Sequence, residues 1–402
     1  MHDADAEKGI LGMLQESQGQ RHLLALQDYP DPDAMASASA QQQLSRSFDV
    51  EAVVVFAGEV SHHQNRRLAE LLGLQLHHLR DGFPLEGFDG AVFIDNQGTT
   101  CPYLVRTLAR AHIPTLMVVD HHEGESSLEP QVRVTEAVGA TATLYAELLQ
   151  GKLELLDLTS AEGRLLASGL LYGILTDTQQ LATATPRDRR AVSWLTPYSD
   201  QALIRDVAGQ PVPWETMEVI GRARTTQVTR RGFRFAGVGY MPARHRDALP
   251  QAATWLLGQG GAHTSVVFGI IRDWRLQETI TGSLRTILPS PTPHEFLQEA
   301  LGEEADGQVM SGGRAFAGGF EIPVGMSSRA SPMEYQMVRW AYYEHLLLQR
   351  LLGAADTTSL HEPATATHPG GALGQGSPYP DLFDRLSPVW KVIDPDGGDG
   401  AG

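Results

Sequence analysis

The feature that most constrains the fold is an apolar run that ends abruptly in three side chains able to bind metal. Residues 115–119 read Thr-Leu-Met-Val-Val, which predicts a buried strand, and Asp120, His121 and His122 follow directly. In α/β folds, ligands bind outside the carboxyl ends of the strands. A lone buried histidine is usually a hydrogen-bonded core residue, but this run has no packing reason to exist. We interpret it as part of a functional site.

Other apolar segments also end in carboxylates. A predicted strand at 23–26 leads to Asp31 and Asp33, and a later strand leads to Asp95. Asp31 and Asp33 flank a proline before an Ala/Ser-rich helix, so they can equally be explained as helix caps. Asp177 follows a strongly apolar helix, where a carboxylate is costly unless it is paired or binds a metal.

Strands alternate with helices up to residue 198, which predicts an α/β domain with a mainly parallel sheet covered on both faces. The rest of the chain predicts a smaller α/β domain. The expected boundaries are 1–20 for a lead-in helix, 21–198 for the N-terminal domain, 199–227 for a connecting segment, 228–353 for the second domain and 354–402 for a disordered Gly/Pro-rich tail.

Composition restricts the classes of function. A formal net charge of -17 argues against a protein that coats long duplex nucleic acid with a basic face, and leaves small anionic substrates open. The single cysteine, Cys101, suits a reducing compartment. The acidic N-terminus is unlike a signal peptide, and no apolar run is long enough to cross a bilayer. We expect a cytoplasmic protein with no membrane partner.

A glycine-rich stretch in the second domain contains Ser311-Gly312-Gly313-Arg314. It suggests a loop whose backbone approaches an anion closely, with the Arg314 guanidinium binding a phosphate or a carboxylate. A glycine-rich hairpin explains the same pattern equally well.

The candidate ligands combine carboxylate oxygens with imidazole nitrogens, which suits Mn²⁺ or a related ion better than a thiolate-rich zinc site. Two such ions can clamp a phosphoryl group and activate water, and they require about this many carboxylates. The candidate residues are Asp31, Asp33, Asp95, Asp120, His121, His122 and Asp177.

The order of these motifs resembles the DHH phosphoesterase family with its DHH-associated C-terminal domain, and is closest to the nano-RNase and adenosine bisphosphate phosphatase branch. The similarity covers roughly residues 20–345, as judged by motif order. It implies a catalytic N-terminal domain that faces the smaller domain across a cleft. The motifs are Pro30-Asp31-Pro32-Asp33-Ala34, Asp95, Asp120-His121-His122, Asp177, Gly282-Ser283-Leu284-Arg285 and Ser311-Gly312-Gly313-Arg314.

The resemblance also implies roles for individual residues, with a metal-bridging water as the nucleophile. Asp120 would bind or support the metal cluster, and His122 would face the scissile phosphate. The first Mn²⁺ would be bound by Asp31 and Asp95, and the second by Asp33, Asp95, His121 and Asp177. The non-reacting part of the substrate would be held by Ser283, Arg285, Gly312, Gly313 and Arg314.

Two positions depart from the family pattern. Many members have a histidine where this chain has Gln27, which leaves the first metal ion with a weaker ligand set. The glycine-rich motif usually ends in histidine, whereas here Arg314 follows Gly313, and an arginine can bind a terminal phosphate through two hydrogen bonds.

We therefore expect an Mn²⁺-dependent phosphoesterase that acts on very short RNA or on nucleoside bisphosphates. A cyclic-dinucleotide phosphodiesterase and a polyphosphatase are alternatives within the same class, and a pyrophosphatase is the least favoured. A catalytically weak nucleotide-binding regulator is the alternative from another class, motivated by Gln27. The sequence leaves the oligomeric state open, with a homodimer as one expectation.

Overall fold

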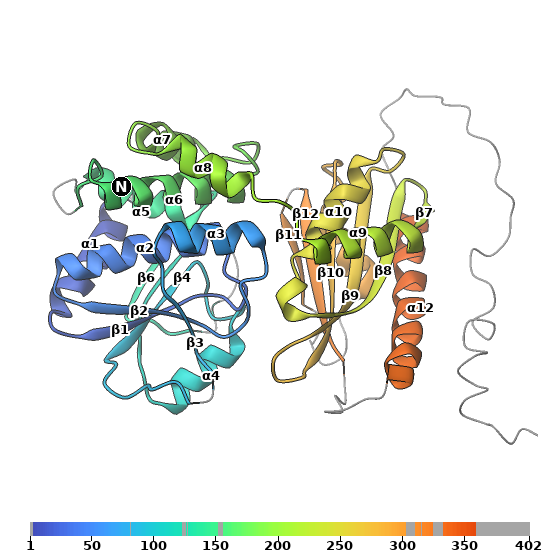
Figure 1. Ribbon diagram of the computed structural model, residues 1–402, viewed down its shortest axis with the longest axis horizontal. Coiled ribbons are helices and arrows are strands. Elements are labelled where there is room, and N and C mark those ends of the chain that lie inside the picture. The colour runs from blue at the N-terminus through green and yellow to red at the C-terminus, as the bar shows by residue number, and fades with distance from the viewer. Residues whose placement is uncertain are drawn as a thin grey trace, which may run out of the picture. The chain divides into compact units, whose positions relative to one another are not determined.

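The computed structural model describes residues 3–80, 82–122, 126, 128–151, 156–302, 310–314, 316–324 and 333–358. The chain divides into two compact units, Met1–Pro213 and Trp214–Gly402 (Figure 1).

A six-stranded parallel sheet organises the first unit (Figure 1). Its strands are β1 (Arg21–Ala25), β2 (Glu51–Phe56), β3 (Leu76–His78), β4 (Gly90–Ile94), β5 (Thr115–Asp120) and β6 (Val132–Thr135). The spatial order is β3-β2-β1-β4-β5-β6, so the chain adds strands outward from β1 in both directions. The order reverses between β1 and β4, and the carboxyl ends of the strands at such a switch point are where open α/β sheets bind ligands.

Helices cover both faces of this sheet, as predicted. They are α1 (Asp3–Glu16), α2 (Pro32–Ser47), α3 (His63–Leu71), α4 (Pro102–Arg110), α5 (Thr141–Gly151), α6 (Ala161–Asp177), α7 (Pro186–Leu195) and α8 (Gln201–Ala208). Alternate strand residues point to opposite faces. Leu24 and Val92 belong to the core that contains residues of α1, α2, α5 and α6, whereas Leu23 and Phe93 belong to a second core with α4.

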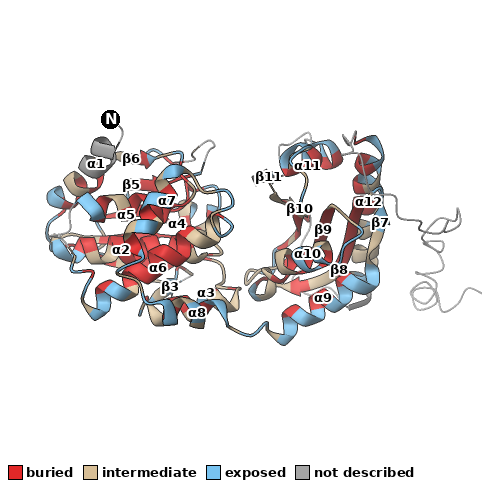
Figure 2. Ribbon diagram, turned by 90° about the horizontal axis from the view of Figure 1, so that it is seen from above, coloured by how far each residue is buried: buried red, intermediate tan, exposed pale blue. Residues whose placement is uncertain are grey.

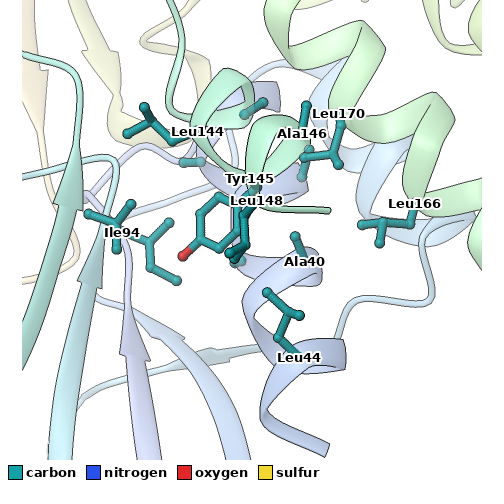
Figure 3. Close-up of a cluster of buried hydrophobic side chains, with 14 of the residues drawn as sticks. Ala40, Leu44, Ile94, Leu144, Tyr145, Ala146, Leu148, Leu166 and Leu170 are labelled. Carbon is teal, nitrogen blue, oxygen red and sulfur yellow. The ribbon is translucent and has the colours of Figure 1, made fainter. Parts of the chain in front are cut away.

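Tyr145 of α5 lies in the middle of the larger core (Figure 3). Its ring packs among aliphatic side chains that include Leu44 of α2, Ile94 of β4 and Leu166 of α6 (Figure 3). The buried hydroxyl donates a hydrogen bond to Oε1 of Gln41 at 2.9 Å, so its polar end is satisfied. This packing fixes the position of α5, whose N-terminal turn contacts Asp33 and Asp95.

Helix starts follow the usual capping chemistry. Asp31 caps α2 and Ser160 caps α6, each through a side-chain oxygen that accepts from a backbone N–H. Thr185 and Asp188 form a reciprocal capping box at the start of α7.

The second unit contains a mixed six-stranded sheet in the order β11-β12-β10-β9-β8-β7, in which only β8 and β9 pair in parallel. Its strands are β7 (Val228–Arg230), β8 (Phe233–Pro242), β9 (Thr264–Arg272), β10 (Glu278–Thr286), β11 (Met310–Arg314) and β12 (Ala317–Pro323). Its helices are α9 (Trp214–Thr226), η1 (Ala243–His245), α10 (Ala248–Gly258), α11 (Pro293–Leu301) and α12 (Met333–Thr357). Buried residues line the sheet where α11 and α12 cover it (Figure 2).

Two segments differ from the expectation. The segment 199–227 is largely helical, with α8 in the first unit and α9 in the second, because both helices bury apolar side chains. Helix α12 continues to Thr357, past the expected start of the tail at 354, because Leu351 and Ala355 are buried in the core of the second unit. Residues 359–402 of that tail lie outside the described residues.

The glycine-rich stretch is a hairpin of β11 and β12. A Cβ atom on Gly313 would lie 2.8 Å from Pro293 Cβ and 2.8 Å from Ala317 O, and a Cβ on Gly318 would lie 2.7 Å from Pro293 Cβ. These glycines therefore have a packing explanation, the close approach of α11.

No helix in the described part of the chain is both long and apolar enough to span a membrane.

We predict opposite effects for the same substitution at two glycines. A Cβ on Gly58 would lie 2.0 Å from the carbonyl oxygen of Asp28, so Gly58→Ala should lower the free energy of unfolding by about 1–3 kcal/mol. Gly12 lies within α1 with no neighbouring heavy atom within 4 Å of the added Cβ, so Gly12→Ala should raise it by about 0.5–1 kcal/mol. Urea denaturation followed by circular dichroism measures both, and equal effects would contradict the close approach at Asp28.

Candidate metal centre

The carboxylates and imidazoles predicted from the motifs of the first unit meet at the carboxyl ends of the parallel strands. Asp33 lies in the first turn of α2, Asp95 follows β4, and Asp177 is the last residue of α6. One potential ligand atom from each residue lies within 4.8 Å of the others in two groups, Asp95 with Asp120, His121 and His122, and Asp33 with His121 and Asp177. The fold therefore brings together six of the seven residues proposed around the metal cluster.

His121 is fully buried, and its two ring nitrogens meet different partners. Nδ1 lies 3.1 Å from Val138 O, and because a carbonyl oxygen can only accept, Nδ1 carries the proton. Nε2 lies 3.1 Å from Asp177 Oδ2, 3.4 Å from Asp95 Oδ1 and 3.8 Å from Asp33 Oδ2. A histidine that donates from one nitrogen to a backbone carbonyl and turns the other toward carboxylates has the arrangement of a metal ligand.

Asp33 and Asp95 both accept hydrogen bonds from the N-terminal turn of α5. Asp33 accepts from the backbone N–H groups of Thr141 and Ala142, each at 2.7 Å, and Thr141 Oγ1 donates to Asp95 Oδ1 at 2.9 Å. The positive end of the α5 dipole favours these negative groups. Asp95 has a φ of 58°, in the left-handed region, which costs about 1–3 kcal/mol and is typical of functional sites.

Asp120 and His122 form a tight pair. Asp120 Oδ1 lies 2.7 Å from His122 Nδ1 and also accepts from the backbone N–H of His121 at 2.8 Å. Burial raises the pKa of Asp120, but the hydrogen bond from His122 and the neighbouring imidazoles outweigh it, so this pKa lies below its ordinary value. The His122 side chain is 45% exposed, so its ring is accessible to a substrate.

The other carboxyls of the site have raised pKa values. Burial, and then the charge of Asp177, raise the pKa of Asp33 to about 7 and that of Asp31 to about 6. Burial and the charge of Asp33 raise the pKa of Asp95 well above its ordinary value. These shifts show that negative charge is crowded in a desolvated place.

A divalent cation fits this donor set. Oδ2 of Asp95 and Oδ2 of Asp120 are buried without a hydrogen-bond partner among the described residues, and such oxygens are costly unless a cation binds them. Asp177 lies at the negative end of the α6 dipole, where a carboxylate is disfavoured without a positive neighbour. Carboxylate oxygens with imidazole nitrogens suit ions such as Mn²⁺ or Mg²⁺.

No model of a known protein family matches the chain. The uncharacterized protein MJ1633 of Methanocaldococcus jannaschii is 30% identical over 307 residues, which cover 76% of this chain and 58% of that protein. The chain thus spans less than two thirds of the length of this curated relative.

A crystal structure of an exopolyphosphatase-related protein from Bacteroides fragilis matches with a TM-score of 0.54 at 13% identity, over 87% of this chain and 98% of that chain. The chain therefore shares its fold with this exopolyphosphatase-related protein. The predicted α/β fold with a parallel sheet in the first unit is confirmed. RecJ from Thermus thermophilus, solved in complex with Mn²⁺, matches with a TM-score of 0.45 at 16% identity, over 88% of this chain and 55% of that chain.

Asp31 is a member of neither group of potential ligand atoms. It is the N-cap of α2, where its Oδ1 accepts from the backbone N–H of Ala34 at 2.9 Å. Its Oδ2 accepts from Nε2 of Gln27 at 3.1 Å. The helix-cap explanation left open by the sequence therefore holds for Asp31.

The substrate-binding candidates lie in the second unit. Ser283 and Arg285 lie on the same face of β10, opposite Leu284, which belongs to the core with α11 and α12. Arg285 donates to Ser283 Oγ at 3.1 Å and to Leu284 O at 2.9 Å, and burial lowers its pKa. A partly buried guanidinium that donates to neutral partners among the described residues favours an anionic ligand.

Gly312, Gly313 and Arg314 belong to β11, at the edge of the second sheet, and Gly312 and Gly313 are exposed. Arg314 pairs with Ala317 through its backbone, and its side chain lies outside the described part of the structure.

Sequence reasoning missed Thr141 and Gln97. Thr141 contacts two of the aspartates, and its place at the start of a helix, where N–H groups lack helical partners, could have indicated it. Gln97 donates to the carbonyl oxygen of His122 at 2.7 Å and accepts from Arg133 at 3.3 Å, which anchors the chain after β5. Nothing in the local sequence indicates that role.

We predict that the stabilisation by metal depends on pH. Without metal, the raised pKa values of about 6 and about 7 for Asp31 and Asp33 mean that the folded protein holds more protons than the unfolded chain above pH 4, so stability is lost as pH rises through 7. A cation competes with these protons. Added Mn²⁺ should therefore raise the melting temperature more at about pH 8 than at about pH 5.5, as measured by scanning fluorimetry. An equal increase at both values would contradict binding at these carboxylates.

We predict that the Thr141 hydroxyl orients Asp95 for metal binding. Thr141→Val keeps the backbone N–H to Asp33 but removes the donor to Asp95, and should weaken Mn²⁺ binding by about 10–100-fold, the range for groups that hold ligands in place. Thr141→Ser keeps the hydroxyl and should restore binding. Isothermal titration calorimetry compares the variants, and wild-type affinity in Thr141→Val would overturn this role.

Proposed function

We propose that this protein is a metal-dependent phosphoesterase that hydrolyses very short oligoribonucleotides, nucleoside bisphosphates or both. One observation carries the proposal. His121 Nε2 faces oxygens of Asp33, Asp95 and Asp177 within 3.1–3.8 Å, in a site that buries carboxylates together. The likeness in fold to an exopolyphosphatase-related protein supports the same class of chemistry.

Two Mn²⁺ ions are the proposed cofactors. Asp33, Asp95, His121 and Asp177 would hold one of them, and Asp95 would also contribute to the other. When bound, such ions neutralise charge on a phosphoryl group and make water a stronger nucleophile.

His122 is the proposed contact to the reacting phosphate. Asp120 Oδ1 lies 2.7 Å from Nδ1 of this ring, so the ring is held in one orientation with Nε2 available to the substrate. When it carries a proton, Nε2 can donate a hydrogen bond to a phosphate oxygen and stabilise the charge that develops there.

The second unit would hold the non-reacting part of the substrate. Arg285 and Ser283 offer a charged and a hydroxyl group on one strand face, and Gly312, Gly313 and Arg314 are the further candidates on β11. The net charge of -17 favours a small anionic substrate over long duplex nucleic acid.

The same site chemistry would also serve a cyclic-dinucleotide phosphodiesterase or a polyphosphatase. A nucleotide-binding regulator with weak catalysis is favoured by one specific observation, the hydrogen bond from Gln27 that occupies Asp31.

The test is release of mononucleotide from 5′-phosphorylated diadenylate in the presence of Mn²⁺. We expect release by the wild-type protein and none by the Asp120→Ala, His121→Ala double variant, because the double change removes a carboxylate and an imidazole from the cluster. Asp95→Ala should be the most damaging single change, beyond the roughly 100-fold upper range for groups that only support ligands.

No release by the wild-type protein, with nucleotide binding intact, would contradict the oligonucleotide substrate and favour a cyclic substrate, polyphosphate or the regulator. Release that persists in the double variant would contradict catalysis at this site.

A further inference from the structure

The short segment 138–143 contacts three of the proposed metal ligands. The carbonyl oxygen of its first residue lies 3.1 Å from Nδ1 of His121 and accepts its proton. Two backbone N–H groups of the segment, where α5 begins, donate to Asp33, and the Thr141 hydroxyl donates to Asp95. The position of this segment therefore decides how the three ligands are oriented.

Asp188 of α7 holds the segment 138–143 at two points. Its side chain is buried, with a residue exposure of 0%. Each carboxylate oxygen lies 3.0 Å from the backbone nitrogen of Gly139, and Oδ1 also accepts from the Thr143 hydroxyl at 2.6 Å. Oδ2 accepts from the backbone N–H of Thr185 at 2.6 Å as part of the capping box of α7. The capping box explains only this last contact, because the other two join α7 to the segment.

The contact with Gly139 leads directly to His121. The N–H of Gly139 and the carbonyl of Val138 belong to one planar peptide group. The N–H donates to the Asp188 carboxylate, and the carbonyl accepts from His121 Nδ1. A charged acceptor at one end polarises the peptide group, so its carbonyl oxygen becomes a stronger acceptor. A stronger acceptor at Nδ1 fixes the ring and raises the basicity of Nε2, the nitrogen that faces the carboxylates.

Glycine at position 139 permits this contact. An added Cβ would lie 2.6 Å from Oδ2 of Asp188 and 2.5 Å from Cγ2 of Thr178. The absence of a side chain therefore lets the carboxylate reach the peptide nitrogen.

We propose that Asp188 is a positioning residue of the metal centre. It acts on His121 through the peptide group that follows Val138, and through Thr143 on the turn of α5 that holds the two carboxylates. Metal-bound histidines commonly donate to a carboxylate directly, and here one peptide group stands between the two. This inference rests on the proposed function only in that these residues bind a divalent cation.

The experiment compares Asp188→Asn with the control variant Thr185→Ala. Asp188→Asn exchanges the charged acceptor for a neutral one of the same shape and turns an amide nitrogen toward one set of donors. Thr185→Ala removes the cap hydroxyl of α7 but keeps the Asp188 carboxylate, so it should lower the melting temperature without changing metal binding. Isothermal titration calorimetry measures Mn²⁺ affinity in the full-length protein without substrate. We expect a loss of about 10–100-fold in Asp188→Asn and wild-type affinity in Thr185→Ala.

A spectroscopic measurement reads the peptide group itself. In protein saturated with diamagnetic Mg²⁺, nuclear magnetic resonance detects the Nδ1 proton of His121, and the signal is assigned by its loss in His121→Gln. A weaker hydrogen bond to Val138 O should move this signal upfield in Asp188→Asn. Thr185→Ala should leave it where the wild type has it.

Wild-type Mn²⁺ affinity in Asp188→Asn would overturn the proposal, and so would an equal loss in Thr185→Ala. A loss of affinity with an unmoved His121 signal would contradict the route through the peptide group. If Asp188→Asn does not fold, Gly139→Ala tests the same peptide group, because the added Cβ displaces it from the carboxylate. Wild-type affinity in that variant would contradict the proposal. These measurements need no turnover, so a failed hydrolysis assay leaves them decisive.

Discussion

The crowding of buried carboxylates at one edge of the parallel sheet is the constraint on which the first unit depends. Desolvation and mutual repulsion both oppose it, as the raised pKa values of Asp33 and Asp95 record. The fold offsets part of this cost with the N-terminal turn of α5, the hydroxyl of Thr141 and the ring of His121. One oxygen of Asp95 and one of Asp120 still lack hydrogen-bond partners among the described residues, which makes both carboxylates candidate ligands for a cation.

The scaffold explains how the carboxylates reach one place. The strand order reverses beside β1, so β1, β4 and β5 are neighbours in the sheet. Asp95 and Asp120 lie at the carboxyl ends of β4 and β5, at the same edge where the chain passes from β1 into α2. Helix α6 comes close to α2 at Gly173, where a Cβ atom would lie 3.0 Å from Asp33 Cα. The packing around Tyr145 holds α5 against the same helices (Figure 3). The site is therefore built on helix and strand ends that a close-packed core keeps in position.

Asp120 connects the buried carboxylate cluster with the exposed ring of His122. One of its oxygens fixes His122, which is 45% exposed, and the other is buried. Arg285 presents the complementary case in the second unit, since its burial lowers its pKa and its shown partners are neutral. Among the described residues, Asp120 thus has an oxygen without a hydrogen-bond partner and Arg285 donates to neutral groups, a pattern typical of binding sites.

The sequence by itself determined the parallel sheet and the set of candidate ligands. Alternating strand and helix patterns carry the fold, and an Asp-His-His run at a strand end has no packing role, so local reasoning sufficed for both. The tertiary structure alone decided how each carboxylate is used. Asp31 and Asp33 look alike in the sequence, but Asp31 caps its own helix and pairs with Gln27, whereas Asp33 reaches the N-terminus of α5. The role of Thr141 and the hairpin formed by Gly313 were likewise decided there. The physical reason is that hydrogen-bond partners and close approaches join residues far apart in the chain, and only the packed structure fixes which of them meet.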